Sequence, residues 1–221
     1  MARVTFKYIK SNPDIQMYVQ KSDDALRAIG YTEHSAAHVD KAAQTAYMLL
    51  MELGFPERDA ELAQIAAYMH DIGNVVNRND HAQSGAVMAF RLLDRMEMPA
   101  EEICTIISAI GNHDEATATP INAVSAALIL ADKTDVRRTR VRNPINRTFD
   151  IHDRVNYAVE ESHFGFNEDK TAVVLDLTID TSIASVMEYF EIFLDRMLLC
   201  KKAAEYLGTQ FFLIVNNSKI L

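Results

Sequence analysis

Histidine and acidic residues in the first half of this sequence have the types and spacing of metal ligands. Of the seven histidines, five fall between positions 34 and 113, beside acids or near the ends of expected helices. These five are His34, His38, His70, His81 and His113. Imidazole and carboxylate groups together hold Fe, Mn, Co, Ni or Zn. A lone histidine is more often a surface or core residue, but the set predicts a metal site.

The most informative unit is Ala66–Gly73, where an apolar helical pattern ends in His70 and Asp71. Adjacent helical residues point about 100° apart, so these two side chains cannot both face one point from mid-helix. At a helix end they can, because the backbone turns at Gly73 and lets both approach a shared ion. Burying an unpaired aspartate is unfavourable, whereas a cation would neutralise it. The pair therefore predicts a metal-binding corner.

Helices must position these residues, and apolar periodicity predicts six of them in the first two-thirds of the chain. Proline, serine or glycine marks most of their starts and stops. The approximate ranges are 13–29, 32–53 (with Ser35 as a second possible start), 56–73, 81–96, 99–110 and 122–132. His38 then lies on the second helix, and the His70–Asp71 pair ends the third.

The pattern changes after Asn143–Pro144. An amphipathic stretch at 151–159 precedes a polar turn at 167–170 and an alternating apolar segment at 173–179, which predicts a strand after a hairpin turn. A helix at 182–207 and a strand at 211–215 follow. The predicted fold is mainly α, with a helical metal-binding domain at 1–147 and a small α+β extension at 148–221.

Length and charge restrict the classes of protein to which the chain can belong. Its 221 residues suit one sizeable domain, or one domain with a small appendage. The net charge of −9 argues against a stable complex with DNA or RNA, whose phosphates require a basic face. A small phosphorylated substrate is compatible with this charge, because a metal or a local arginine cluster can reverse the field in one pocket.

Cysteine usage and hydropathy predict a cytoplasmic protein without a membrane partner. Cys104 and Cys200 lie far apart among apolar residues, so we expect both to be buried and to form no disulfide framework. No apolar run approaches the ~20 residues that span a bilayer. The first ten residues lack the apolar stretch of a signal peptide.

The order His38, His70–Asp71, Asp132 resembles the H…HD…D signature of the HD-domain superfamily of metal-dependent phosphohydrolases. Asp132 stands in Leu128–Asp135, which is similar to the family's final apolar helix and its aspartate. The resemblance covers about residues 30–142 and implies an HD-type helical bundle. It also implies that His38, His70, Asp71 and Asp132 bind one divalent transition-metal ion.

Some members of this family hold a second ion through two further histidines, and the matching positions are His81 and His113. Without an ion, His81 would be a neighbour of a helix cap and His113 a partner of a helix C-terminus. His34 precedes His38 by one helical turn and resembles the proton donor of cyclic-nucleotide phosphodiesterases; its alternative is a solvated residue at a helix start. Asn74 departs from the lysine that many members carry after the HDIG motif.

Basic residues crowd the segment after Asp132, inside an acidic protein. Arginine forks match phosphate oxygens, so this segment could hold a substrate phosphate. The alternative is a solvated or salt-bridged basic loop. The candidates for substrate binding are Lys133, Arg137, Arg138, Arg140 and Arg142.

Together, the residues and the resemblance predict hydrolysis of a phosphate ester or anhydride by metal-activated water, with Asp71 and His34 acting in catalysis. The expected substrate is a small phosphorylated compound, with nucleotides as the first class, and one or two ions are expected. A homodimer is a further expectation. Two alternatives are a di-iron oxygenase of the inositol-oxygenase type and a non-catalytic nucleotide-binding sensor.

Overall fold

The structure, a computed structural model, describes residues 3–115, 117–142 and 151–221. The chain divides into two compact units, Met1–Asp132 and Lys133–Leu221. The domain boundary expected between residues 147 and 148 lies outside the described residues.

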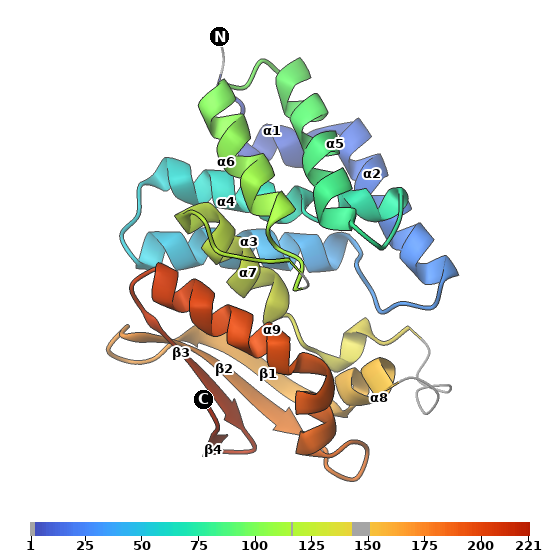
Figure 1. Ribbon diagram of the computed structural model, residues 1–221, viewed down its shortest axis with the longest axis vertical. Helices are drawn as coiled ribbons and strands as arrows, with labels where there is room; N and C mark the ends of the chain where they lie inside the picture. Colours follow the sequence, from blue (N-terminus) through green and yellow to red (C-terminus); the bar gives the residue numbers. More distant parts are fainter. Residues whose placement is uncertain (1–2, 116, 143–150) are drawn as a thin grey trace. The chain divides into compact units, whose positions relative to one another are not determined.

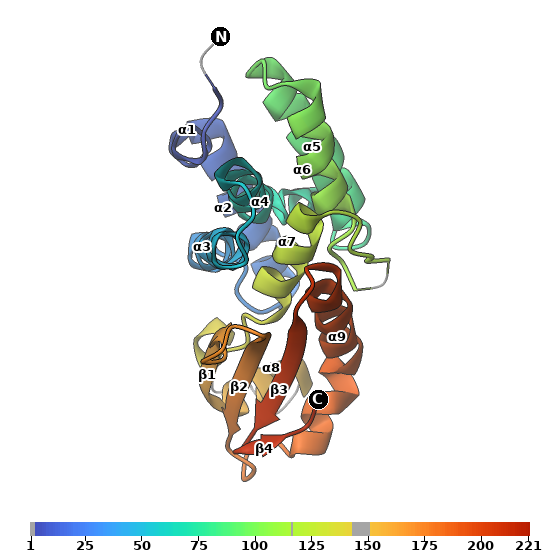
Figure 2. The ribbon, with the colours of Figure 1, turned by 90° about the vertical axis from the view of Figure 1, so that its left-hand side faces the viewer.

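The first unit is built from helices (Figure 1). Helices α3 and α4 pack side by side, and so do α5 and α6, as the two ribbon views show (Figures 1 and 2). The elements are α1 (Phe6–Ser11), α2 (Pro13–Ala28), α3 (Ala36–Glu52), α4 (Glu57–Met69), the 3₁₀ turn η1 (Ile72–Val75), α5 (His81–Arg95), α6 (Ala100–Gly111) and α7 (Ala123–Lys133).

Local sequence signals account for where several helices begin. The Asn12 side chain accepts hydrogen bonds from the N–H groups of Asp14 and Ile15, ahead of a proline at the first position of α2. Ser35 caps α3 in the same way. Helix α1 was not predicted; its cap is Thr5, whose hydroxyl accepts from the N–H of Tyr8.

Small side chains allow α3 and α4 to approach closely. Ala42 and Ala46 on α3 and Ala63 and Ala66 on α4 are fully buried. Most of the second half of α4 is buried, including Ile65 and Met69. The C-terminal end of α4, where His70 stands, therefore lies in the interior of this unit.

The second unit combines a mixed four-stranded sheet with helices. The sheet order is β1-β2-β3-β4, with β1–β2 and β3–β4 antiparallel and β2–β3 parallel. Helix α9 connects the two parallel strands and packs against both of them (Figure 2). The elements are η2 (Arg138–Arg140), α8 (Ile151–Ala158), β1 (Val159–Phe166), β2 (Ala172–Ile179), α9 (Val186–Tyr206), β3 (Gln210–Val215) and β4 (Ser218–Lys219).

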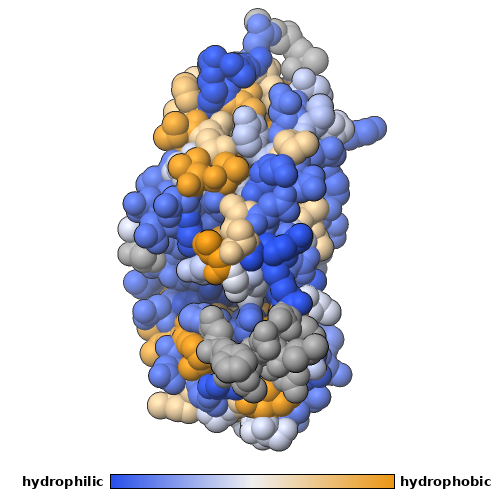
Figure 3. All heavy atoms as spheres, turned by 90° about the vertical axis from the view of Figure 1, so that its right-hand side faces the viewer, coloured by the Kyte–Doolittle hydropathy of each residue, from blue (hydrophilic) through white to orange (hydrophobic). Residues whose placement is uncertain are grey.

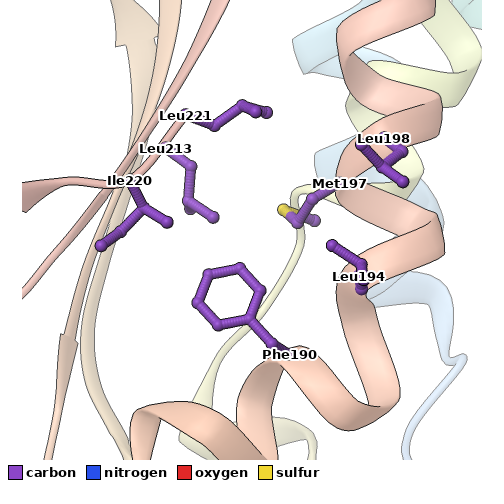
Figure 4. A pocket seen from close by; sticks show the side chains of 7 residues that line it. All are labelled: Phe190, Leu194, Met197, Leu198, Leu213, Ile220 and Leu221. Atoms are coloured by element: carbon purple, nitrogen blue, oxygen red, sulfur yellow. The ribbon is translucent and has the colours of Figure 1, made fainter.

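Alternating side chains of the sheet form the core of the second unit. Apart from Ala172 at the start of β2, the buried residues of β2 and β3 alternate along each strand as predicted: Val173, Leu175, Leu177, Ile179, Phe211, Leu213 and Val215. A pocket of about 280 Å³ lies between α9 and the C-terminal strands. Figure 4 shows its lining, which is apolar throughout: Phe190, Leu194, Met197, Leu198, Leu213, Ile220 and Leu221.

The predicted fold class is confirmed: the chain is mainly α, with a small C-terminal α+β part. The prediction for Cys104 was wrong, since this residue is exposed on α6, whereas Cys200 is buried in α9. The buried stripe of α6 contains Ile103 and Ile106, and a residue directly after Ile103 is turned away from that stripe by about 100°.

Hydrophilic side chains cover much of the face shown in Figure 3, with apolar residues scattered between them. Among the helices that the structure describes, none combines the length and the apolar character that crossing a membrane requires.

Candidate metal centre

Six side chains that are distant in the sequence converge inside the first unit. Each of them is 9% exposed or less. They are His38 on α3, His70 and Asp71 at the turn after α4, His81 at the start of α5, His113 after α6, and Asp132 near the end of α7.

The first four predicted ligands have suitable mutual distances. Asp132 Oδ1 lies 3.2 Å from His38 Nε2 and 3.6 Å from His70 Nε2. His70 Nε2 lies 3.3 Å from Asp71 Oδ2. Two adjacent ligand atoms that each lie about 2.0–2.2 Å from one ion are separated by about 2.8–3.6 Å in octahedral or tetrahedral geometry. The separations therefore fit a shared divalent ion.

A second group of ligand atoms adjoins the first through Asp71. Oδ1 of Asp71 lies 3.5 Å from His81 Nε2, which is 3.2 Å from His113 Nε2. Ligand atoms of these three residues lie within 4.8 Å of one another. Asp71 thus presents one oxygen to His70 and the other to His81, an arrangement that could serve one ion or two.

Backbone carbonyls orient three of the imidazole rings. Nδ1 of His70 lies 2.7 Å from the Ala67 carbonyl oxygen, and Nδ1 of His113 lies 2.6 Å from that of Ile110. Nδ1 of His81 lies 3.0 Å from the carbonyl oxygen of Arg78. Carbonyl oxygens only accept, so each Nδ1 is assigned the hydrogen. In the neutral ring, the lone pair then belongs to Nε2, the atom that faces the cluster.

Burial and charge compete at the His70–Asp71 pair. Burial alone would lower the pKa of His70, but the carboxylates of Asp71 and Asp132 outweigh it and raise that pKa to about 10. Burial would likewise raise the pKa of Asp71, but His70 above all holds it well below its usual range. Without an ion, the two residues therefore form a buried charge pair.

Two atoms of this pair favour a bound cation. Nε2 of His70 and Oδ2 of Asp71 are buried and, among the described residues, have no hydrogen-bond partner of suitable geometry. Buried polar atoms left in this state are unfavourable, and a divalent ion between them would satisfy both. The donor set of imidazole and carboxylate groups fits a transition-metal ion.

Glycine allows the turn after α4 to touch the start of α5. A Cβ atom on Gly73 would lie 2.0 Å from the His81 carbonyl oxygen and 2.5 Å from the Gly85 nitrogen, closer than any side chain permits. From the other side, the Ser22 hydroxyl of α2 donates to the Ile72 carbonyl oxygen at 2.9 Å. These contacts place His81 beside Asp71.

Sequence reasoning missed the roles of Asn74 and Arg78. The Asn74 amide donates to Asp71 Oδ1 at 2.9 Å and to the Asp71 carbonyl oxygen at 3.0 Å, so it orients a predicted ligand. Nη1 of Arg78 lies 3.4 Å from Asn74 Oδ1 and 3.3 Å from His81 Nε2. The sequence contained one indication of these contacts: Arg78 follows Asn74 by four residues and precedes His81 by three.

His34 lies beside this cluster but precedes α3 rather than standing on it. Its ring centroid is 5.6 Å from that of His38. Nδ1 of His34 lies 2.9 Å from the Thr32 carbonyl oxygen, and its backbone N–H donates to Asp23 Oδ1 at 2.9 Å. The loop is thus held by α2, and the two rings are neighbours without sharing a helix face.

Comparison with known proteins matches residues 36–137 to the HD domain family. The chain contains an HD domain. All six clustered residues fall inside the matched range, and the predicted membership of the HD-domain superfamily is confirmed. Members of this superfamily are generally hydrolases that bind divalent metals.

One curated relative also matches the chain. It is an uncharacterized protein, MJ1020, of Methanocaldococcus jannaschii, which is 25% identical over 173 residues. The match spans 68% of this chain and 66% of the relative, just under two thirds of the relative's own length.

Most of the predicted substrate-binding arginines follow the HD domain. In the second unit, Nε and Nη2 of Arg137 contact the two carboxylate oxygens of Asp135 at 2.9 and 3.3 Å. Arg138 Nε donates to the Tyr157 carbonyl oxygen at 2.6 Å, and Arg140 Nη1 donates to the Asp135 carbonyl oxygen at 2.9 Å. Lys133 is buried, and Arg142 is partly buried. Substrate contact by these five residues stays a prediction.

Proposed function

We propose that this chain is a metal-dependent phosphohydrolase that acts on a phosphate ester or anhydride of a small molecule, with nucleotides as the first substrate class to test. The observation that supports this most strongly is that the six histidine and aspartate side chains form one buried cluster of overlapping ligand groups. Such a set suits a divalent cation far better than it suits an apolar core.

His38, His70, Asp71 and Asp132 would hold one ion, and Asp71, His81 and His113 are placed to hold a second. Fe, Mn, Co, Ni and Zn all suit these ligands. The chemistry that a divalent ion supplies when bound is activation of water for attack on phosphorus near neutral pH. Asn74 would keep Asp71 oriented through its hydrogen bond to Oδ1.

His34 is proposed to protonate the leaving oxygen. With the Nδ1 hydrogen directed to the Thr32 carbonyl oxygen, a protonated ring carries its second proton on Nε2. That proton could be donated to the oxygen of the departing group. The hydrogen bond between the His34 backbone N–H and Asp23 would hold the backbone of this loop during this step.

The proposed location and partners of the protein follow from its charge and composition. We propose a cytoplasmic location and a small phosphorylated substrate. A chain of net charge −9 is poorly suited to a stable complex with nucleic acid. A homodimer belongs to the same proposal and can be tested by the mass of the protein in solution.

The deciding experiment compares the wild-type protein with Asp71→Asn after loading with Mn²⁺ or Fe²⁺. A phosphate-release screen over nucleotides and other small phosphate compounds would show turnover by the wild type. We expect Asp71→Asn to lower it by at least about 100-fold, because Asp71 contacts both ligand groups. Asp94→Asn on the surface of α5 removes the same charge and should leave turnover unchanged.

Full turnover by Asp71→Asn would contradict the proposal. Oxygen consumption without phosphate release would instead favour a di-iron oxygenase. Tight nucleotide binding without turnover, across several metals, would favour a sensor.

A further inference from the structure

Arg78 places a positive charge at the edge of the metal-ligand cluster. Its Nη1 lies 3.3 Å from His81 Nε2 and 3.4 Å from Asn74 Oδ1. Its guanidinium carbon lies 5.6 Å from the centre of the Tyr31 ring, within the range of a cation–π contact. The side chain is partly buried, and its contacts with Asn74, His81 and Tyr31 hold the cation beside the ligands.

Arg78 has no acidic partner among the described residues, although the chain has 31 acidic and 22 basic residues. Arg58 and Arg137 show the usual arrangement in this molecule. Each pairs its Nε and Nη2 groups side-on with one carboxylate, of Glu102 and Asp135 respectively. In the described part of the chain, the same edge of Arg78 has no hydrogen-bond partner.

An unpaired Nε–Nη2 edge matches two oxygens of a phosphoryl group, just as it matches a carboxylate. The ligand cluster itself contains two carboxylates, Asp71 and Asp132, which repel a phosphate until positive charge offsets them. A fixed guanidinium at the edge of the cluster contributes such charge in addition to any metal. Arg78 therefore has the charge, the free donors and the position that an anionic substrate requires.

We propose that Arg78 binds two non-bridging oxygens of the substrate's phosphoryl group through its Nε and Nη2 groups. This inference rests on the proposed phosphohydrolase function and deepens it by naming a substrate-binding residue. Any ion bound by His81 Nε2 would take the lone pair to which Nη1 of Arg78 now donates. Loading the site would then break only the contact between Nη1 and His81, while the bond from the same Nη1 to Asn74 and the contact with Tyr31 still held the side chain.

The test is binding of inorganic phosphate to the Mn²⁺-loaded protein, measured by isothermal titration calorimetry. Arg78→Ala should weaken binding by about 10- to 100-fold, the usual effect of losing a charged hydrogen-bonding group. Arg78→Lys should be intermediate, because it keeps the charge and loses the fork. Arg91→Ala, on the exposed face of α5, removes the same charge and should bind phosphate as the wild type does.

The metal content of each variant, measured by elemental analysis, separates the explanations. We expect Arg78→Ala to contain as much metal as the wild type. More metal, with unchanged phosphate affinity, would overturn the proposal and show that Arg78 excludes an ion from His81. Equal phosphate affinity in wild type and Arg78→Ala would also overturn it. If the wild type neither binds phosphate nor releases it from any substrate, the proposed function fails, and the inference about Arg78 fails with it.

Discussion

The two units of this chain differ in how their buried polar side chains are arranged. In the first unit, six histidine and aspartate residues meet inside a helical core. In the second unit, the sheet and α9 bury apolar side chains, and a partly open pocket there is lined only by apolar residues. Among the described residues, every group that could hold a metal ion lies in the first unit.

The two units also differ in their buried polar atoms that lack a hydrogen-bond partner. In the first unit, His70 Nε2 and Asp71 Oδ2 are buried without a hydrogen-bond partner among the described residues. In the second unit, Nη2 of Arg138 is also buried without such a partner, but Arg137 and Arg140 are engaged with Asp135, and no metal-ligand group of the described residues lies there. Unsatisfied buried groups are unfavourable in a folded protein unless a ligand satisfies them. The first unit is therefore the better candidate for ligand binding.

The largest expected effect comes from Gly73→Ala in the first unit. The new Cβ would collide with the His81 carbonyl oxygen and push the start of α5 away from Asp71. We expect metal affinity to fall by about 100-fold or more and the free energy of unfolding to fall by about 1–3 kcal/mol. Metal titration and urea unfolding measure the two effects.

The matched control for this change is Gly111→Ala at the end of α6. There the nearest atom to a new Cβ is the Cβ of Ala86 at 3.7 Å, an ordinary contact. Alanine favours a helix over glycine by up to about 1 kcal/mol, so this variant should be as stable as the wild type or more so. Full metal affinity in Gly73→Ala would show that the close contact does not position His81.

A smaller effect is expected from Arg137→Ala in the second unit. Asp135 is buried, and this change removes its two contacts with Arg137, so the free energy of unfolding should fall by about 1–3 kcal/mol while metal content stays the same. Asp135→Asn and the double variant complete a cycle that measures the coupling between the two residues.

Steady-state kinetics of Arg137→Ala would show whether the second unit also contributes to substrate binding. A raised KM at unchanged kcat would support the predicted substrate contact, and the second unit would then share in the chemistry. An unchanged KM would mean that Arg137 stabilises the second unit and does not contact the substrate.

The smallest effect is the pH dependence of metal binding. The pKa of His70 is about 10 in the metal-free protein, so below that pH an incoming ion must displace one proton. Affinity should therefore rise by about tenfold per pH unit between pH 6.5 and 8.5, equivalent to about 1.4 kcal/mol. Competition with a chelator of known pH dependence measures the slope.

His163→Gln is the control for this slope, because His163 is an exposed histidine on β1. It should leave the pH dependence unchanged. An affinity that does not vary with pH would mean that no proton leaves His70 when the ion binds.

Much of the first unit could be predicted because helix boundaries depend on neighbouring residues. Pro13 and Ser35 mark helix starts through local hydrogen bonding and fixed backbone angles, and the structure agrees. The position of His70 and Asp71 at a helix end was predicted from the apolar pattern that stops there. Helix α1 and strand β4 escaped prediction because they are short and carry little periodic pattern.

The sequence by itself determined the mainly α fold, the order of the ligands along the chain and the helix ends that carry them, because spacing along a helix follows from backbone geometry. Tertiary structure alone decided that Asp71 faces His81 as well as His70, that His81 meets His113 and that Cys104 is exposed. These relations join atoms from different elements or depend on which face of a helix is covered. Tertiary packing determines which elements meet and which helix face is covered, and no pattern of neighbouring residues predicts these two outcomes.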